Sequence, residues 1–218
     1  MYGGGFWQDV MRAGAIVGIV MALSHIVEQY VMIYSGMSLS ATVLVYSVEW
    51  LVAMAIYAFL LFLFAKQRIE RCDPKIAIGF SQVLSYVVMV SMFAGVFVGL
   101  ANTFYLDAMG YDRYVDGMLM RIDEMQRMVS KVGGEELYDD MFTEMVSIIR
   151  SSTQPTIFVN IFSSLNSYIL SGGFVGLIIS AILRRDATTN SNEYRQRREW
   201  HGQFFCILNR QLINGSSL

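Results

Sequence analysis

The chain has 218 residues, of which 55% are hydrophobic and 16% are charged, and its formal net charge is −2. Four long apolar stretches leave no room in so short a chain for a separate soluble enzyme domain, so we expect one small helical membrane domain. The near-neutral charge does not indicate a nucleic-acid partner, and none is expected.

Each of the four apolar stretches is long enough to cross a bilayer, which takes about 20 apolar residues for about 30 Å of hydrocarbon. Backbone groups in hydrocarbon must be paired internally, and the alternating segments of a β-barrel are missing, so we predict helices. The fold class is therefore all-α, a polytopic membrane protein. The predicted spans are 13–34, 41–65, 76–105 and 156–183.

The connections between the spans differ in charge. Connection 35–40 contains no Lys or Arg, whereas the next connection contains four, and Arg184 and Arg185 follow the fourth span. Basic residues close to span ends prefer the cytoplasm. We therefore predict that both termini are cytoplasmic and that the first and third connections lie outside. The four basic residues are Lys66, Arg68, Arg71 and Lys75.

The third connection, 106–154, is predicted to be an amphipathic helical hairpin outside the membrane. Its apolar residues recur at helical spacing on both sides of Gly133-Gly134, which is typical of a turn. The two stripes either pack on each other and on the rim of the bundle, or they form a docking surface with adaptable Met side chains. The first stripe contains Tyr111, Val115, Met118, Ile122, Met125, Val129 and Val132; the second contains Leu137, Met141, Met145 and Ile148. The candidate docking residues are Met118, Met125, Met141 and Met145.

Residues 186–218 are predicted to be a basic cytoplasmic tail, either an amphipathic helix on the inner leaflet or a disordered segment. The two cysteines, Cys72 and Cys206, lie beside basic clusters that we place in the cytoplasm. A structural disulfide is therefore not expected.

Small residues four apart occur in three of the spans. This spacing lets helix backbones approach closely, which matters because lipid supplies no hydrophobic drive for helices to associate. The pairs favour a tight bundle within one subunit, and self-association through one of these faces is the alternative. The glycines are Gly14 and Gly18, Gly95 and Gly99, and Gly172 and Gly176.

Six polar residues are predicted at membrane depth, all in the outer half of the spans, with Ser24 and Gln29 beside them. Ionisable groups there cost on the order of 2.5–3.5 kcal/mol, so the six should face the interior and find partners. They form either a structural hydrogen-bonded knot or a proton or cation site in which a His titrates beside two carboxylates. The six are His25, Glu28, Glu49, Asn102, Asn160 and Asn166.

Motifs of catalysis, cofactor binding and metal binding are missing from the sequence. It contains no P-loop, no HExxH, no CxxC pair and no GxSxG. We therefore expect neither enzymatic activity nor a cofactor nor a metal site.

Two stretches carry a resemblance to a known family. They read IAIGFSQVLSYVVMVSMFAGVFVGLANTFYLDAMGYDRYVDGM from Ile76 and GGFVGLIISAILRR up to Arg185, with the acidic, Met-rich segment between them. Over roughly residues 10–185 the chain resembles the small bacterial membrane proteins of domain-of-unknown-function family 4199. The resemblance implies four spans with an outer helical insert, and no assigned activity. Genes of the family often lie near one for a polyprenyl-phosphate glycosyltransferase, which implies an envelope-glycan partner.

Two functions are compatible with these observations. The first is a non-enzymatic accessory or scaffold subunit of the bacterial inner membrane that docks a membrane-protein partner, such as the envelope-glycan machinery that the resemblance implies, through the outer hairpin. A homo-oligomer is the other partner compatible with the sequence. The alternative is a small proton- or cation-coupled transporter or channel that uses Glu28, Glu49 and His25. The small size and the absence of an internal repeat count against the alternative.

Overall fold

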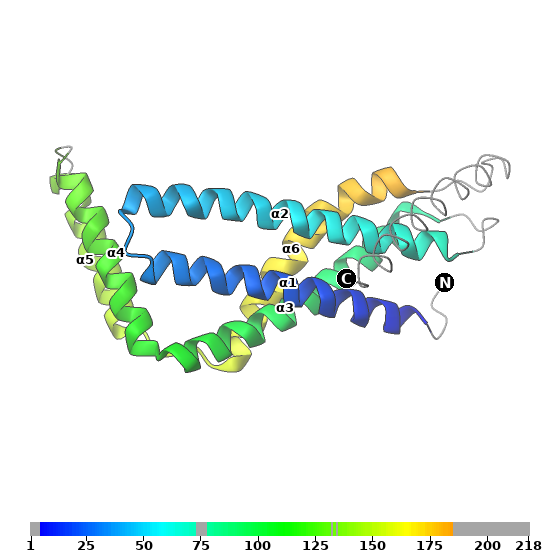
Figure 1. The fold of residues 1–218 in the computed structure, drawn as a ribbon, viewed down its shortest axis with the longest axis horizontal. Coiled ribbons are helices and arrows are strands. Elements are labelled where there is room, and N and C mark those ends of the chain that lie inside the picture. The colour runs from blue at the N-terminus through cyan, green and yellow to red at the C-terminus, as the bar shows by residue number, and fades with distance from the viewer. Residues whose placement is uncertain (1–4, 73–77, 132, 134, 185–218) are drawn as a thin grey trace, which may run out of the picture.

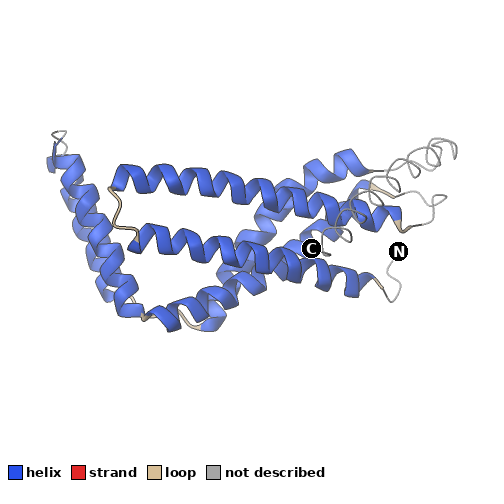
Figure 2. Ribbon diagram, viewed as in Figure 1, coloured by secondary structure: helices blue, strands red, loops and turns tan. Residues whose placement is uncertain are grey.

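The structure is a computed structural model that describes residues 5–72, 78–131, 133 and 135–184 (Figure 1). These residues form six α-helices and no strand, which confirms the all-α fold class (Figure 2). The helices are α1 (Phe6–Tyr34), α2 (Leu39–Glu70), α3 (Phe80–Met109), α4 (Tyr111–Lys131), α5 (Glu135–Ser151) and α6 (Ile157–Leu183). Four of them, α1, α2, α3 and α6, are long and apolar enough to cross a membrane, so the chain is a multi-pass membrane protein. The predicted tail lies outside the described residues.

Helices α1 and α2 are longer than the apolar stretches that predict them. α1 begins seven residues before the predicted 13, and α2 continues five residues beyond the predicted 65, to Glu70. Helical hydrogen bonding continues beyond the hydrocarbon, and Asp9 on the added turns of α1 pairs with Arg68 on the added turns of α2. The helix of the third span begins at Phe80 rather than 76, and the residues 73–77 before it are not described.

Helix α3 is the centre of the bundle. It packs most extensively against α6 on one side and α1 on the other, while α2 packs mainly against α1. Within the described residues α1 and α6 do not contact each other. The core follows the inner part of these contacts and includes the fully buried Val10, Val17, Leu61, Val87 and Val90.

Glycines set the distance between α3 and its neighbours. A Cβ on Gly14 would lie 2.5 Å from Phe93 Cβ, and a Cβ on Gly99 would lie 2.5 Å from the Ile161 Cα. Real atoms do not approach so closely, so a larger residue would force the helices apart. All six glycines singled out in the sequence lie at contacts between spans of this one chain; the others are Gly18, Gly95, Gly172 and Gly176.

Helices α4 and α5 form a hairpin that lies across the ends of α1 and α2 nearest their connection (Figure 1). The chain turns out of α3 at Gly110, with φ +84°, and between α4 and α5 at Gly133, with φ +77°, a conformation that glycine adopts without strain. Helix α4 contacts α1, α2 and α3, whereas α5 contacts only α4 among the described helices. Among the described helices, α4 is therefore the part of the hairpin that packs against the bundle.

Candidate functional site

A hydrogen-bonded network joins α1, α3 and α6 near the hairpin end of the bundle. The Gln29 side-chain amide donates to Asn102 Oδ1 over 2.9 Å. The Asn102 amide donates to Asn160 Oδ1 over 3.3 Å, and the Asn160 amide donates to Thr103 Oγ1 over 3.0 Å. Thr103 in turn donates to the Gly99 carbonyl. Side chains from three spans thus hold the helices in register.

Of the two carboxylates, Glu28 of α1 joins the network through His25, and Glu49 of α2 makes a separate hydrogen bond to α1. Gln29 Nε2 lies 2.9 Å from His25 Nε2, and His25 Nδ1 lies 3.1 Å from Glu28 Oε2. If the amide donates to Nε2, the proton of a neutral His25 is on Nδ1, where it is donated to Glu28. Glu49 accepts a hydrogen bond from Ser24 and so ties α2 to α1.

The network runs sideways across the bundle rather than along it. At about 1.5 Å per residue, Glu28, Asn102 and Asn160 lie roughly 9, 10 and 5 Å from the hairpin ends of their helices, and Glu49 about 15 Å. Two amides, Gln29 and Asn102, separate His25 from the α6 end of the network. Amide side chains do not titrate near neutral pH, so they form hydrogen bonds here but do not relay protons along the network. The arrangement is that of a clamp between helices.

Two of the six predicted residues are not joined to this network by hydrogen bonds: Glu49, which bonds to Ser24, and Asn166. Asn166 is exposed on α6 and does not face the interior, so the expectation that it joins the interior group is wrong. Asn160 and Asn166 are six residues apart, which turns their side chains roughly 240° from each other around the helix. Sequence reasoning missed Thr103, which directly follows Asn102 in the sequence and accepts from the Asn160 amide.

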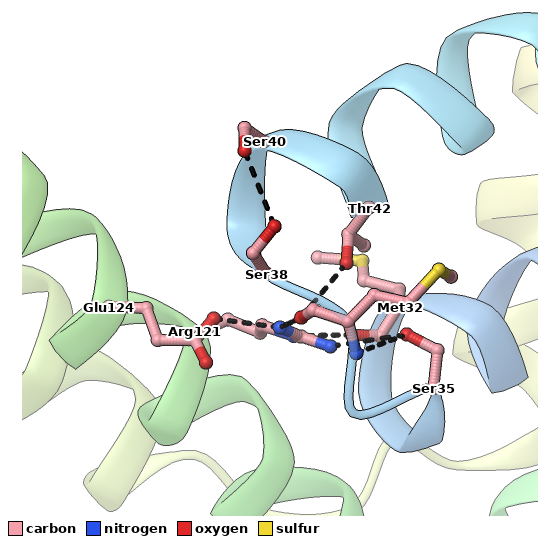
Figure 3. A network of polar contacts seen from close by, with 8 residues as sticks. Met32, Ser35, Ser38, Ser40, Thr42, Arg121 and Glu124 are labelled. Atoms are coloured by element: carbon pink, nitrogen blue, oxygen red, sulfur yellow. Dashed lines mark hydrogen bonds and ion pairs between the residues drawn. The ribbon is translucent and has the colours of Figure 1, made fainter.

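A buried arginine fastens the hairpin to the bundle (Figure 3). Arg121 on α4 is only 5% exposed, and its Nε donates to the Met32 carbonyl of α1 over 2.6 Å. Its Nη1 donates to the Met37 carbonyl in the α1–α2 connection over 3.0 Å and to Glu124 over 2.7 Å. The last carbonyls of a helix have no partner within the helix, and Arg121 satisfies one at the end of α1. No motif marks this residue in the sequence.

The predicted docking methionines are divided between the interior and the surface of the hairpin. Met118, Met125 and Met145 are half-buried, and Met141 is exposed. On α5 the residue that packs inward is Phe142, whereas Met141 and Ile148 are exposed. Of the two alternatives for this stripe, packing against the neighbouring helix is therefore wrong for Met141 and Ile148, and the docking surface stays a prediction. The side chain of Leu137 lies outside the described residues.

An apolar stripe on α5 is left without a neighbour. Tyr138, Met141 and Ile148 are 41%, 45% and 58% exposed, and their spacing of three and seven residues places them on one face. Because α5 contacts only α4 among the described helices, no described helix covers this face. The acidic Asp140 and Glu144 are exposed beside it, whereas Asp139 accepts a hydrogen bond from Gln126 of α4. We name the exposed face, with its acidic border, the α5 stripe.

Comparison with known proteins places the chain among sequences without an assigned role. A family model described as "Protein of unknown function (DUF4199)" matches residues 12–185, which cover all four spans apart from the first turns of α1. No curated protein and no solved structure matches the chain.

Proposed function

The chain belongs to the DUF4199 family of proteins of unknown function, and from that premise we propose that it is a non-enzymatic accessory or scaffold subunit in a bacterial inner membrane. It docks the extramembrane part of another membrane protein through the α5 stripe. The hairpin is then on the outer side and the two ends of the chain are cytoplasmic.

The observation that carries this proposal is the exposed apolar face of α5 outside the spans. Lipid explains the many exposed apolar residues of α1, α2, α3 and α6, because those helices cross the membrane. It does not explain Tyr138, Met141 and Ile148, which lie on a helix of the polar hairpin. Contiguous apolar surface on an extramembrane element is typical of a binding face.

The chemistry of the stripe defines the partner that it fits. Met and Tyr side chains adapt to an apolar partner surface and provide large contact area. The exposed carboxylates of Asp140 and Glu144 border the stripe, so the complementary surface is apolar with basic groups at its edge. An anionic lipid headgroup surface is a poor match, because segment 107–150 contains ten acidic and five basic residues.

The attachment of the hairpin supports the same role. Arg121 holds α4 to the α1–α2 connection through hydrogen bonds to two main-chain carbonyls. Gly117 of α4 lies directly against the Ile33 side chain of α1, where a Cβ would not fit. A surface that is held in place before it binds loses less entropy on binding. The α5 stripe is thus carried by a hairpin whose position on the bundle is fixed before a partner binds.

The arrangement of the carboxylates does not support the transporter alternative. The hydrogen bonds that link Glu28 to the other spans run across the bundle and pass through the amides of Gln29 and Asn102. A clamp that fixes the register of the spans on which the hairpin stands fits the scaffold function.

Site-specific photocrosslinking in living cells tests the proposal. We expect a photoreactive amino acid at Met141 or Ile148 to give a discrete adduct with one other membrane protein, identified by mass spectrometry. The matched control is Arg127, which is 74% exposed on the same hairpin but lies on the other helix, α4. A Met141→Asp change should abolish the adduct formed at Ile148. Equal adducts from Arg127, or adducts from no position, would contradict the proposal. An adduct between two copies of the chain would show that the stripe binds a second copy and would contradict a foreign partner.

A further inference from the structure

A small basic pocket lies at the opposite end of the bundle from the hairpin, between the first turns of α1 and the last turns of α2. Its volume is about 90 Å³, and Asp9, Arg12, Arg68 and Arg71 supply its charged lining. Tyr86 of α3 closes one side and Gln67 contributes a polar amide. Three arginines and one aspartate give the pocket a net charge of +2.

The internal ion pairs account for only part of this charge. Arg68 and Arg71 each direct one nitrogen, Nη1, at the Asp9 carboxylate. Arg68 is held further by the Phe6 ring, whose centroid lies 5.6 Å from its guanidinium carbon. Arg71 remains 60% exposed, and a guanidinium has five N–H donors, of which the bond to Asp9 uses one. Arg12 makes no ion pair with any described residue.

We propose that this pocket binds the phosphate of an anionic phospholipid. Arg71 and Arg12 donate to the phosphate oxygens, and the pairs with Asp9 hold the helices in the geometry that the phosphate requires. Arginine forms planar, two-pronged hydrogen bonds with phosphate, and basic pockets between membrane helices are suited to lipid headgroups. This proposal does not depend on the docking function of the hairpin.

The apolar part of the lining is the reason to choose a lipid over a soluble phosphate. Ile16 and Phe64 also line the pocket, each four residues deeper into the membrane than Arg12 and Arg68 respectively. Four residues of helix correspond to about 6 Å, so charged groups lie at the membrane boundary and apolar groups lie one turn inside it. The exposed Ile19, three residues further along α1 on the side of Ile16, continues the apolar surface. A molecule with an anionic head and an acyl chain matches both parts.

Binding of defined lipids to the full chain in detergent micelles tests this assignment. Native mass spectrometry would measure the bound fraction with phosphatidylglycerol and with phosphatidylcholine of the same acyl chains. We expect tighter binding of phosphatidylglycerol, whose phosphate charge is not balanced by choline. Arg12→Gln and Arg71→Gln should each weaken it by about 5-fold, the effect of about one surface charge near an anionic lipid.

The matched control is Arg184→Gln, which removes the same charge at the same end of the bundle but outside the pocket. Both pocket arginines in the test are exposed, and a thermal melt of each variant checks that it folds. Three results would overturn the proposal: an equal loss in Arg184→Gln, equal binding of both lipids, or unchanged binding in a variant that combines Arg12→Gln with Arg71→Gln. Competition by millimolar inorganic phosphate would identify a soluble phosphate as the ligand and overturn the lipid assignment, whereas no competition supports it.

Discussion

Arg121 Nε lies 2.6 Å from the main-chain carbonyl oxygen of Met32, and this hydrogen bond joins the hairpin to the end of α1. The two residues are 89 positions apart in the chain, so the contact is a product of the tertiary fold. It places a cation at a helix C-terminus, where the partial negative charge of the helix dipole favours it.

The Arg121→Gln variant should lose about 2–4 kcal/mol of unfolding free energy, because the Met32 and Met37 carbonyls and Glu124 lose a buried donor. Faster hydrogen exchange in α4 and a lower melting temperature are the expected results. Arg127→Gln on the same helix removes only a surface pair with Asp123 and should cost less than about 0.5 kcal/mol. An equal loss of unfolding free energy in the two variants would show that Arg121 does not hold the hairpin to the bundle.

Substitutions of the carboxylates distinguish a clamp from a proton site. Glu28→Gln and Glu49→Gln should be tolerated, because an amide keeps the shape and most hydrogen bonds to His25 and Ser24. Leu at either position should cost about 1–3 kcal/mol, because the polar partners are left without a bond. Thermal melts measure both changes.

The control for the carboxylates is Asn166→Leu, which changes a polar residue of the spans outside the network and should be neutral or stabilising. A folded Glu28→Gln protein that has lost its partner binding or an ion flux would show that ionisation of Glu28 is required, contrary to the clamp interpretation.

The close approach of α3 and α6 predicts a steric effect of one methyl group. Gly99→Ala should destabilise the bundle by about 1–3 kcal/mol, because the new Cβ would lie 2.5 Å from the Ile161 Cα and only a backbone shift relieves the clash. Gly173→Ala on α6 meets no atom within 4 Å and should change stability by less than about 0.5 kcal/mol. Unfolding in a denaturing detergent compares the two, and similar midpoints would contradict the packing argument.

The orientation in the membrane is testable with single cysteines in a background that carries Cys72→Ser and Cys206→Ser. An impermeant thiol reagent added to bacterial spheroplasts should label Ser38→Cys and Gly134→Cys but not Arg184→Cys. Ser38 and Arg184 are both exposed, so burial does not account for a difference between them. Native Cys72 is less informative, because it is half-buried and its thiol donates to the Arg68 carbonyl. Labelling of Arg184→Cys from outside would reverse the topology.

The four spans could be predicted from the sequence because length and apolarity are local properties of a segment. The turn of the hairpin could be predicted in the same way, because glycine is the residue that adopts a positive φ without strain and Gly133 has one. The ends of the spans could not be predicted as well. Helices α1 and α2 continue past their apolar stretches, where Asp9 pairs with Arg68 and Arg71. These arginines are 59 and 62 residues from Asp9 in the sequence, so the pairing is not a local property of either segment.

Only the packing of the helices determines which polar side chains contact each other. Asn160 and Asn166 are the same residue type on one helix, and only the contact of α3 with α6, which Gly95 and Gly99 permit, turns Asn160 toward Asn102 and leaves Asn166 exposed. The partners of Arg121 are likewise determined by packing, because the carbonyls without a helical partner at the end of α1 are within its reach only where α4 lies beside them. Periodicity identifies the faces of a helix, but a partner is needed to decide which face is buried.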